Sequence, residues 1–516
     1  MKRGAQAEAQ GQMGDAEQSY RQALALDPAH ARGHFALGNL HAMRYEFDLA
    51  RTAYLRALEL QPDFAGVWGN LGNIEKYLGH FTQAFACYRR AIEHEADPRQ
   101  QARRHSNLLL ALHYDEGLSH DELYRAHVEW AERYARHLYP ARRVAKNNTD
   151  GLRRLRIGYV SGGFCENDIA EHFLRSVLAR HDPSQFEIIV YAKSRAGMAQ
   201  SPKLRALVRH WVDIEPMGDA AVAARIGADG LDIAIDLDGH NPTGSLLAFA
   251  RGLAPVQIEW LDWFDTSGVA TLDYILTDPW TTPVDSPQRF SETPARLPHS
   301  RFCYSPVEYA PPVAATPVGA GRPLTFGSFN RQDKLHPRLY GIWAEILHAV
   351  PDSRLLLKNR ALQIAAIRDG VITHFTQLGI AHERLVLRGP SPHADMLQEY
   401  SDIDICLDTF PYNGGLTTCE CLWMGVPIVA LEAERMIGRQ TSAMLRVLGL
   451  DDWVATSPVG YVRLAVAKGT LRDEVESLRA TLRQRLAASP ICDAARFTRD
   501  LESVYRALWQ RYCAAA

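Results

Sequence analysis

The stretch Leu407–Pro427, LDTFPYNGGLTTCECLWMGVP, joins the end of an apolar strand, a Gly-Gly turn and the start of a helix. A strand, a glycine turn and a helix in succession are typical of a doubly wound α/β sheet. Ligands of such sheets bind beyond the carboxyl ends of the strands, where this turn is expected to lie. The stretch therefore predicts the fold class of its domain and a ligand site in the turn.

Short apolar segments that alternate with helical segments extend outward from this stretch in both directions. In the second half of the chain they lie at 324–328, 354–358, 385–387, 404–407 and 428–431. In the first half they lie at 155–161, 186–192, 231–237, 256–260 and 274–277. A run rich in Pro, Ala and Gly separates the two series. This alternation predicts two parallel sheets, each covered by helices on both faces, with a cleft between them.

The first hundred residues repeat with a period of 34, as Tyr20, Tyr54 and Tyr88 show. Small residues recur at fixed positions with the same period, which is typical of tetratricopeptide repeats. The alternative is a generic array of helical hairpins. In the first repeat only the second helix, near 15–26, looks well formed. Such repeats form a concave groove for another chain, in which Asn70 and Asn107 would either bind a peptide backbone or be solvated.

These patterns divide the chain into an α part and an α/β part. The predicted units are tetratricopeptide repeats at 1–98, a helical bridge and linker at 99–150, an N-terminal Rossmann-like lobe at 151–310, an interlobe linker at 311–322, a C-terminal Rossmann-like lobe at 323–490 and a C-terminal helix at 491–516. Because each lobe buries its own sheet, we expect that residues 1–98 can be removed without loss of ligand binding in the cleft.

The composition narrows the classes of protein to which the chain belongs. The formal net charge is −3, which argues against a broad nucleic-acid-binding surface. No apolar run approaches the ~20 residues of a membrane helix, and the first residues lack the apolar stretch of a signal peptide. The eight cysteines are scattered without zinc-ribbon spacing. The expectation is a reduced cytoplasmic protein with no structural metal.

Candidate ligand-binding residues follow the predicted strands of the second half. Lys334, after the first of these strands, can neutralise a diphosphate leaving group, unless it is a solvated surface lysine. Gly414 allows close approach of the backbone. Thr417 and Thr418 at a helix start suit phosphate, and Glu420 can accept hydrogen bonds from a ribose diol. The alternative is a capped helix start with Thr as N-cap and Glu as its capping-box partner.

Three residues of the first half are candidates for the general base. His240 ends a predicted strand in the sequence DLDGH, and imidazole titrates near neutral pH. Its alternative roles are to orient an acceptor or to hold the turn. Asp262 and Asp265 are the other candidates, with an acceptor-shaping or solvated loop as the alternative.

From Leu155 to Trp509 the chain resembles the O-linked N-acetylglucosamine transferase and SPINDLY-like glycosyltransferases of the bacterial type, which also carry N-terminal tetratricopeptide repeats. The segments that carry the resemblance include LRIGYVSGGF, IDLDGH, APVQIEWL, FGSFNRQDKLHP, LDTFPYNGGLTTCECLWMGVP and SPICDAARFTRDLE. The resemblance implies a tetratricopeptide superhelix followed by a GT-B-like pair of Rossmann-type lobes. It also implies an inverting, metal-independent transferase with no cofactor other than its donor. The donor would be a nucleoside-diphosphate sugar, UDP-GlcNAc in the first instance, and the acceptor a protein or peptide held in the repeat groove.

The resemblance also implies roles for single residues. It places Lys334 on the diphosphate and Glu420 on the ribose. Thr417 and Thr418 fall on the phosphates, in a helix start that begins with Asn413 and Gly414. Ser391 and His393 fall in the loop that contacts the base.

Departures from the family pattern concentrate on the acceptor side. Asn167 stands where the family usually has a histidine, and His172 follows five positions later. Asp262 and Asp265 replace small residues. Acidic residues at the cleft predict a neutral or basic acceptor segment, because like charges repel. The alternatives to transfer are a nucleotide-binding repeat scaffold with weak or lost catalysis and a sugar-nucleotide epimerase.

Overall fold

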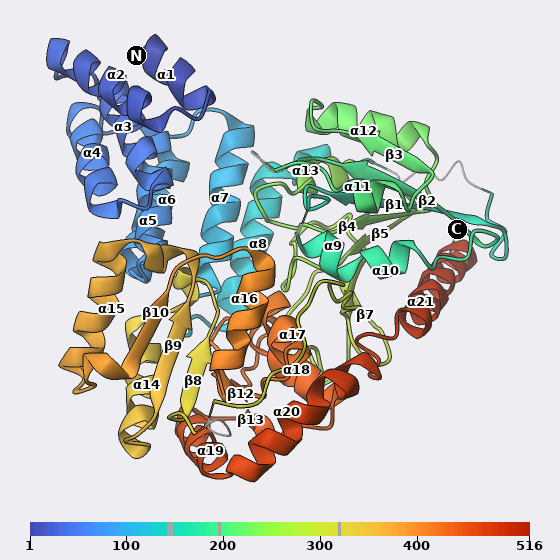
Figure 1. Ribbon diagram of the computed structural model, residues 1–516. Helices are drawn as coiled ribbons and strands as arrows, with labels where there is room; N and C mark the ends of the chain where they lie inside the picture. The colour runs from blue at the N-terminus through green and yellow to red at the C-terminus, as the bar shows by residue number, and fades with distance from the viewer. Residues whose placement is uncertain (142–147, 167, 195–197, 318–320, 516) are drawn as a thin grey trace.

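The computed structural model describes residues 1–141, 148–166, 168–194, 198–317 and 321–515. An arm of antiparallel helices leads into two α/β lobes (Figure 1). This arrangement confirms the fold class expected from the sequence. Among the described residues, no helix is both long and apolar enough to cross a membrane.

The arm consists of helix pairs that stack through small residues. Its helices are α1 (Lys2–Ala9), α2 (Met13–Leu26), α3 (Ala31–Met43), α4 (Phe47–Leu60), α5 (Ala65–Tyr77) and α6 (Phe81–His94). A Cβ atom on Gly38 would lie 2.5 Å from the ring of Tyr54, and one on Gly72 would lie 2.9 Å from the ring of Tyr88. Close packing of glycine on tyrosine thus explains the 34-residue period. The first repeat is more complete than expected, because α1 packs against α2.

The helical bridge joins the arm to the N-terminal lobe. It contains α7 (Pro98–Leu112) and α8 (His120–Tyr134). One buried cluster includes Tyr88 of α6, Leu109 of α7, Trp130 of α8 and Phe249 of the lobe. The last repeat, the bridge and the lobe therefore share a hydrophobic core.

The N-terminal lobe is a seven-stranded parallel sheet with the strand order β3-β2-β1-β4-β5-β6-β7. Its strands are β1 (Leu155–Ser161), β2 (Phe186–Ala192), β3 (His210–Asp213), β4 (Ile233–Asp236), β5 (Val256–Glu259), β6 (Tyr274–Thr277) and β7 (Thr293–Arg296). Its helices are α9 (Ile169–Phe173), α10 (Arg175–Leu178), α11 (Pro202–Arg205), α12 (Asp219–Ala228) and α13 (Leu246–Phe249). The chain order reverses direction between β1 and β4, which is the switch point of a doubly wound sheet.

The C-terminal lobe repeats this plan with six strands in the order β10-β9-β8-β11-β12-β13. Its strands are β8 (Thr325–Ser328), β9 (Arg354–Lys358), β10 (Leu385–Arg388), β11 (Ile405–Leu407), β12 (Ile428–Leu431) and β13 (Val454–Ala455). Its helices are α14 (Pro337–Ala349), α15 (Ala365–Gln377), α16 (His393–Glu399), α17 (Leu416–Trp423), α18 (Gln440–Val447), α19 (Pro458–Thr470) and α20 (Arg472–Ala487). The switch points of the two sheets supply the loops that face each other.

The last helix, α21 (Ala494–Ala515), returns to the N-terminal lobe (Figure 1). Its Tyr505 hydroxyl lies 3.1 Å from the hydroxyl of Tyr159 in β1. Its Glu502 carboxylate lies 3.0 Å from Nδ1 of His181. Two segments of the chain, the interlobe linker and the connection from α20 to α21, therefore pass between the lobes.

Candidate active site

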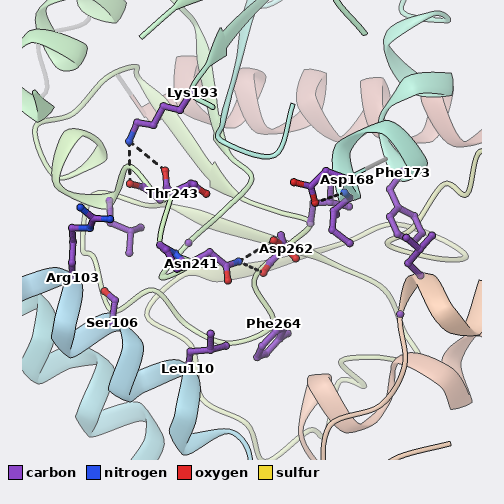
Figure 2. Close-up of a pocket in the computed structure, with 18 of the residues that line it drawn as sticks. Arg103, Ser106, Leu110, Asp168, Phe173, Lys193, Asn241, Thr243, Asp262 and Phe264 are labelled. Atoms are coloured by element: carbon purple, nitrogen blue, oxygen red, sulfur yellow. Dashed lines mark hydrogen bonds between the residues drawn. The ribbon is translucent and has the colours of Figure 1, made fainter. Parts of the chain in front are cut away.

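A cavity of about 930 Å³ lies between the two lobes, and the bridge helix α7 closes one side of it. The C-terminal lobe contributes Asn330, Arg331, Lys334, Tyr412, Gly415, Leu416, Thr417 and Gln440 to its lining. Figure 2 shows the opposite wall, where Arg103, Ser106 and Leu110 of α7 face loops of the N-terminal lobe. The cavity therefore brings together the carboxyl edges of both sheets, where the sequence predicted a ligand site.

Lys334 is buried in the wall of this cavity with 8% of its surface exposed. Its Nζ donates a hydrogen bond of 2.6 Å to the backbone carbonyl of Asn413 and lies 4.1 Å from the centre of the Tyr412 ring. Burial, with a further contribution from Arg331, lowers the pKa of Lys334 to about 7, while Asp408 and Asp333 oppose the shift. A cation in this environment gains from an anionic ligand, so the solvated-lysine alternative does not apply.

The N-terminus of α17 opens onto the same cavity. The helix begins at Leu416 with Gly415 as N-cap, so the Thr-Glu capping box is not formed. Thr417 lines the cavity, and its hydroxyl lies 3.4 Å from the amide oxygen of Asn330. Thr418 is buried behind it, with its hydroxyl 2.9 Å from that of Thr441. Of the two threonines, only Thr417 is placed to meet a ligand directly.

Asn413 and Gly414 shape the turn from behind. The side-chain amide of Asn413 donates to the carbonyl of Thr409 at 2.8 Å. The backbone N–H of Gly414 donates to Asp408 at 2.9 Å. A Cβ atom on Gly414 would lie 2.4 Å from the Thr418 hydroxyl, so only glycine fits there.

The buried Glu420 pairs with the partly exposed His393. Nε2 of His393 lies 2.7 Å from Oε1 of Glu420, and Nδ1 lies 2.7 Å from the hydroxyl of Tyr309. Burial raises the pKa of Glu420, and the hydrogen bond to His393 opposes the shift. His172, expected on the acceptor side, packs its ring on His393 with the centroids 6.0 Å apart. Ser391 stays outside this pair because its hydroxyl donates to Glu399 at 2.8 Å.

His240 lies behind the cavity wall, although its neighbours Gly239 and Asn241 line the cavity. Its Nε2 donates to the carbonyl of Ser267 at 2.8 Å, so its Nδ1 accepts from the hydroxyl of Ser106 at 3.0 Å. Burial holds the pKa of His240 well below its usual value. These contacts correct the expectation that His240 takes a proton from the acceptor. Both ring nitrogens are occupied, and the ring instead ties the lobe to the bridge.

The two acidic residues expected at the acceptor side point in different directions. Asp262 lines the cavity and accepts a hydrogen bond of 3.0 Å from the amide of Asn241, as Figure 2 shows. Asp265 is buried, and its Oδ2 lies 3.7 Å from Nε2 of His113 in the bridge. Of the two acidic residues expected at the cleft, only Asp262 therefore faces it. Asn167 lies outside the described residues.

Several lining residues were missed by the sequence analysis. Lys193 follows β2 and donates to the carbonyls of Thr243 and Gly244 at 3.3 and 3.1 Å (Figure 2). Asn241 follows β4. Both positions could have been found by the rule that ligands bind beyond strand ends. Arg103 and Ser106 carry no such signal, because they belong to the bridge, which packs against the lobes only in three dimensions.

Comparison with known proteins places this site in a family. The profile of Glycosyl transferase family 41 matches residues 131–308 and 320–501, which together make up more than half of the chain. The chain belongs to Glycosyl transferase family 41. A tetratricopeptide profile also matches residues 65–97. The match to family 41 covers the lining of the cavity except for the residues of α7 and Trp130 of α8.

Two curated relatives carry the name "Probable UDP-N-acetylglucosamine–peptide N-acetylglucosaminyltransferase SPINDLY". The protein of Oryza sativa subsp. japonica is 39% identical over 414 residues, and that of Solanum lycopersicum is 36% identical over 412 residues. Each alignment covers 79% of this chain and 44% of the relative. The chain thus spans less than half the length of these curated relatives.

A solved structure matches over the full length of this chain. It is a lysine-to-methionine mutant of the O-GlcNAc transferase of Thermobaculum terrenum, with a TM-score of 0.91 and 34% sequence identity. The match covers 100% of this chain and 98% of that chain. The arm, bridge and two lobes therefore occur together in another protein of similar size.

Proposed function

We propose that the protein is an inverting glycosyltransferase that moves GlcNAc from UDP-GlcNAc to a hydroxyl group of a protein or peptide. The observation that carries this proposal is the buried Lys334 beside the N-terminus of α17 in the interlobe cavity. A lysine with a lowered pKa and a helix N-terminus together suit a diphosphate. The names of the relatives support the choice of sugar and acceptor.

The donor is proposed to lie along the face of α17. Lys334 and Thr417 contact the diphosphate, and Gly414 lets the turn pack closely against Thr417 and Thr418. Glu420 lies one turn after Thr417 on the same face, which would place Glu420 and His393 at the nucleoside end of the donor. Lys334 and the backbone amides supply the positive potential, so we expect donor binding without an added divalent metal.

Asp262 is the proposed acceptor of the proton, since it is the member of the predicted base candidates that lines the cavity. The acceptor oxygen attacks the anomeric carbon on the face opposite the phosphate and forms the new C–O bond. The bond from that carbon to the diphosphate oxygen breaks, and its electron pair leaves with UDP. The hydroxyl proton passes to the Asp262 carboxylate, and Lys334 stabilises the charge on the leaving group.

A second cavity connects this site to the arm. It has a volume of about 310 Å³ and shares Arg103, Leu110 and Pro242 with the main cavity. Its other lining residues are Asn73, Lys76, Tyr88 and Asn107. This continuity supports the entry of a protein acceptor along the inner face of the repeats.

The asparagines of the arm support the same path, with one change from the sequence analysis. Asn70 donates to Asn39 at 2.7 Å within the arm. The asparagine that lines the second cavity with Asn107 is Asn73, and Asn39, Asn73 and Asn107 follow the repeat period. We infer that Asn73 and Asn107, rather than Asn70, face an extended acceptor.

Transfer of labelled GlcNAc from UDP-GlcNAc to proteins of the native host tests the proposal. The wild-type protein should label protein acceptors, and Asp262→Asn should slow labelling while UDP binding stays unchanged. Tight UDP binding with no transfer to any protein would establish the scaffold alternative. Release of an epimerised nucleotide sugar in place of labelled protein would establish the epimerase.

A further inference from the structure

Three buried side chains that the proposed reaction does not use meet where the bridge joins the N-terminal lobe. His113 caps the C-terminus of α7, His127 belongs to α8, and Asp265 lies in the loop after β5. Each is at most 2% exposed. One nitrogen of each histidine and one carboxylate oxygen all lie within 4.8 Å of one another.

The protonation of His127 is fixed by the backbone. Its Nδ1 lies 2.7 Å from the carbonyl of Leu123, one turn earlier in α8, and a carbonyl can only accept a hydrogen bond. The proton is therefore on Nδ1, and Nε2 carries a lone pair. Among the described residues this buried Nε2 has no hydrogen-bond partner. Histidines that bind metals are typically held in this way, with the second nitrogen donating to a carbonyl.

His113 and Asp265 are the other two side chains of this cluster. Neither ring nitrogen of His113 has a hydrogen-bond partner within the described part of the chain, and both are buried. A neutral imidazole carries a lone pair on one of these two nitrogens. Oδ1 of Asp265 accepts from the backbone N–H of Thr266 at 2.7 Å, while Oδ2 faces Nε2 of His113 at 3.7 Å, beyond hydrogen-bond range.

The nitrogens of His113 and His127 are costly to bury without a partner, since one unsatisfied buried polar group costs about 1–3 kcal/mol. A cation would bind both nitrogens and the carboxylate of Asp265 at once. Zn–N and Zn–O bonds of about 2.0–2.2 Å bring ligands to roughly 3–4 Å of one another, so small side-chain rotations close the site. The guanidinium of Arg435 nearby is directed at the backbone carbonyls of Asp115 and Leu118.

We propose that His113, His127 and Asp265 bind a divalent metal ion of the zinc class. Two imidazoles and one carboxylate are ligands that Zn²⁺ prefers. The three residues do not line the interlobe cavity, so the ion is structural and separate from donor binding. It would clamp both helices of the bridge to the loop that presents Asp262 to the cavity.

The test is metal binding by the full-length protein. Chelator-treated wild type should bind about one Zn²⁺ per chain in competition with a chromophoric chelator, and Co²⁺ should give visible d–d absorption. Asp265→Asn and His113→Asn remove one ligand each at nearly constant volume. Each should weaken Zn²⁺ binding by more than roughly 100-fold, because even loss of an outer-shell partner costs 10–100-fold. Asp262→Asn, three residues away, should bind Zn²⁺ like the wild type.

Added Zn²⁺ should raise the unfolding temperature of stripped wild type but not of Asp265→Asn. Absence of Zn²⁺ and Co²⁺ binding by stripped wild type would overturn the proposal, and this result does not depend on the folding of any variant. Equal Zn²⁺ affinity in the wild type and both ligand variants would also overturn it. Binding of UDP in metal-free buffer, measured in parallel, tests the proposed donor site independently.

Discussion

At the residue scale, the environment of Lys334 makes its charge depend on the ligand. Burial and Arg331 favour the neutral amine, whereas a diphosphate would favour the ammonium. The residue was predicted from the sequence by its position after a strand. Its burial and its contact with the carbonyl of Asn413 come from residues 79 positions apart, which no local pattern reveals.

Lys334→Ala should lower the turnover of GlcNAc transfer by roughly 10²–10³-fold, because it removes the cation that stabilises the leaving diphosphate. Steady-state kinetics with saturating UDP-GlcNAc measures this loss. Lys203→Ala changes a lysine whose side chain is 64% exposed and should behave like the wild type. Turnover within threefold of wild type in Lys334→Ala would remove Lys334 from the reaction.

UDP binding should take up a proton above pH 7. The pKa of Lys334 in the free protein is about 7, and the bound diphosphate raises it, so the amine is protonated on binding. Apparent UDP affinity should therefore fall as the pH rises from 7 to 9, by up to about tenfold per pH unit. Calorimetry at pH 8 in two buffers of different ionisation enthalpy measures the uptake. Lys334→Gln should abolish it, and an unchanged uptake in that variant would assign the proton to another group.

The residues that sequence analysis misplaced share one physical property. His240 and Asp265 both follow strands of the N-terminal lobe, as a catalytic residue would. The bridge helices cover this part of the sheet edge, and they turn both side chains into a buried interface. Strand position predicts nearness to the edge, but it does not predict which part of that edge another domain covers.

At the scale of elements, the interior strands were predicted closely, and three of the four edge strands were missed. The ranges of β1, β2, β6, β9 and β12 agree with the sequence, because buried strands are continuous apolar runs. The missed strands β3, β7 and β13 lie at sheet edges. Edge strands are short and partly polar, since one side faces no partner strand. They therefore carry little periodic signal.

The start of α17 should not tolerate a side chain at position 414. In Gly414→Ala the new methyl group meets the hydroxyls of Thr418 and Thr417 at 2.4 and 2.9 Å, so the turn that holds the start of α17 must shift. We expect UDP affinity to fall at least tenfold and stability to fall by about 1–3 kcal/mol. Calorimetry and denaturant unfolding measure the two effects.

Gly370→Ala is the matched control, because Gly370 lies in α15 with no atom within 4 Å of the added methyl group. This variant should keep its UDP affinity and gain about 0.5–1 kcal/mol of stability. If Gly414→Ala bound UDP as tightly as Gly370→Ala does, the packing of this turn would not shape the donor site.

At the scale of the whole molecule, the arm is continuous with the rest of the protein. Lys76 of α5 lies 3.8 Å from Asp333, the neighbour of Lys334, and Tyr88 of α6 belongs to the same core as α7. Removal of residues 1–98, which the sequence alone suggested to be harmless to ligand binding, would expose this core and remove a partner of Asp333.

Two truncations distinguish the role of the arm in acceptor recognition from its role in supporting the donor site. Removal of residues 1–64 takes away α1–α4 and should leave UDP binding within about twofold, while transfer to a protein acceptor falls. Removal of residues 1–98 should in addition lower the unfolding temperature and weaken UDP binding. Thermal unfolding, calorimetry and transfer assays on both proteins provide the comparison. Equal UDP binding by the two truncated proteins would show that α5 and α6 do not support the donor site.

The return of α21 to the N-terminal lobe has a consequence for synthesis of the protein on the ribosome. The last strand of that lobe ends at Arg296, and the helix that covers it begins at Ala494. At about 5–20 residues per second, the intervening ~200 residues take roughly 10–40 s to synthesise. During this time the surface that receives Phe497 and Tyr505 is uncovered. We expect the nascent first lobe to need protection of this surface until α21 has been made, and chains that stop before α21 should be prone to aggregation and rapid degradation.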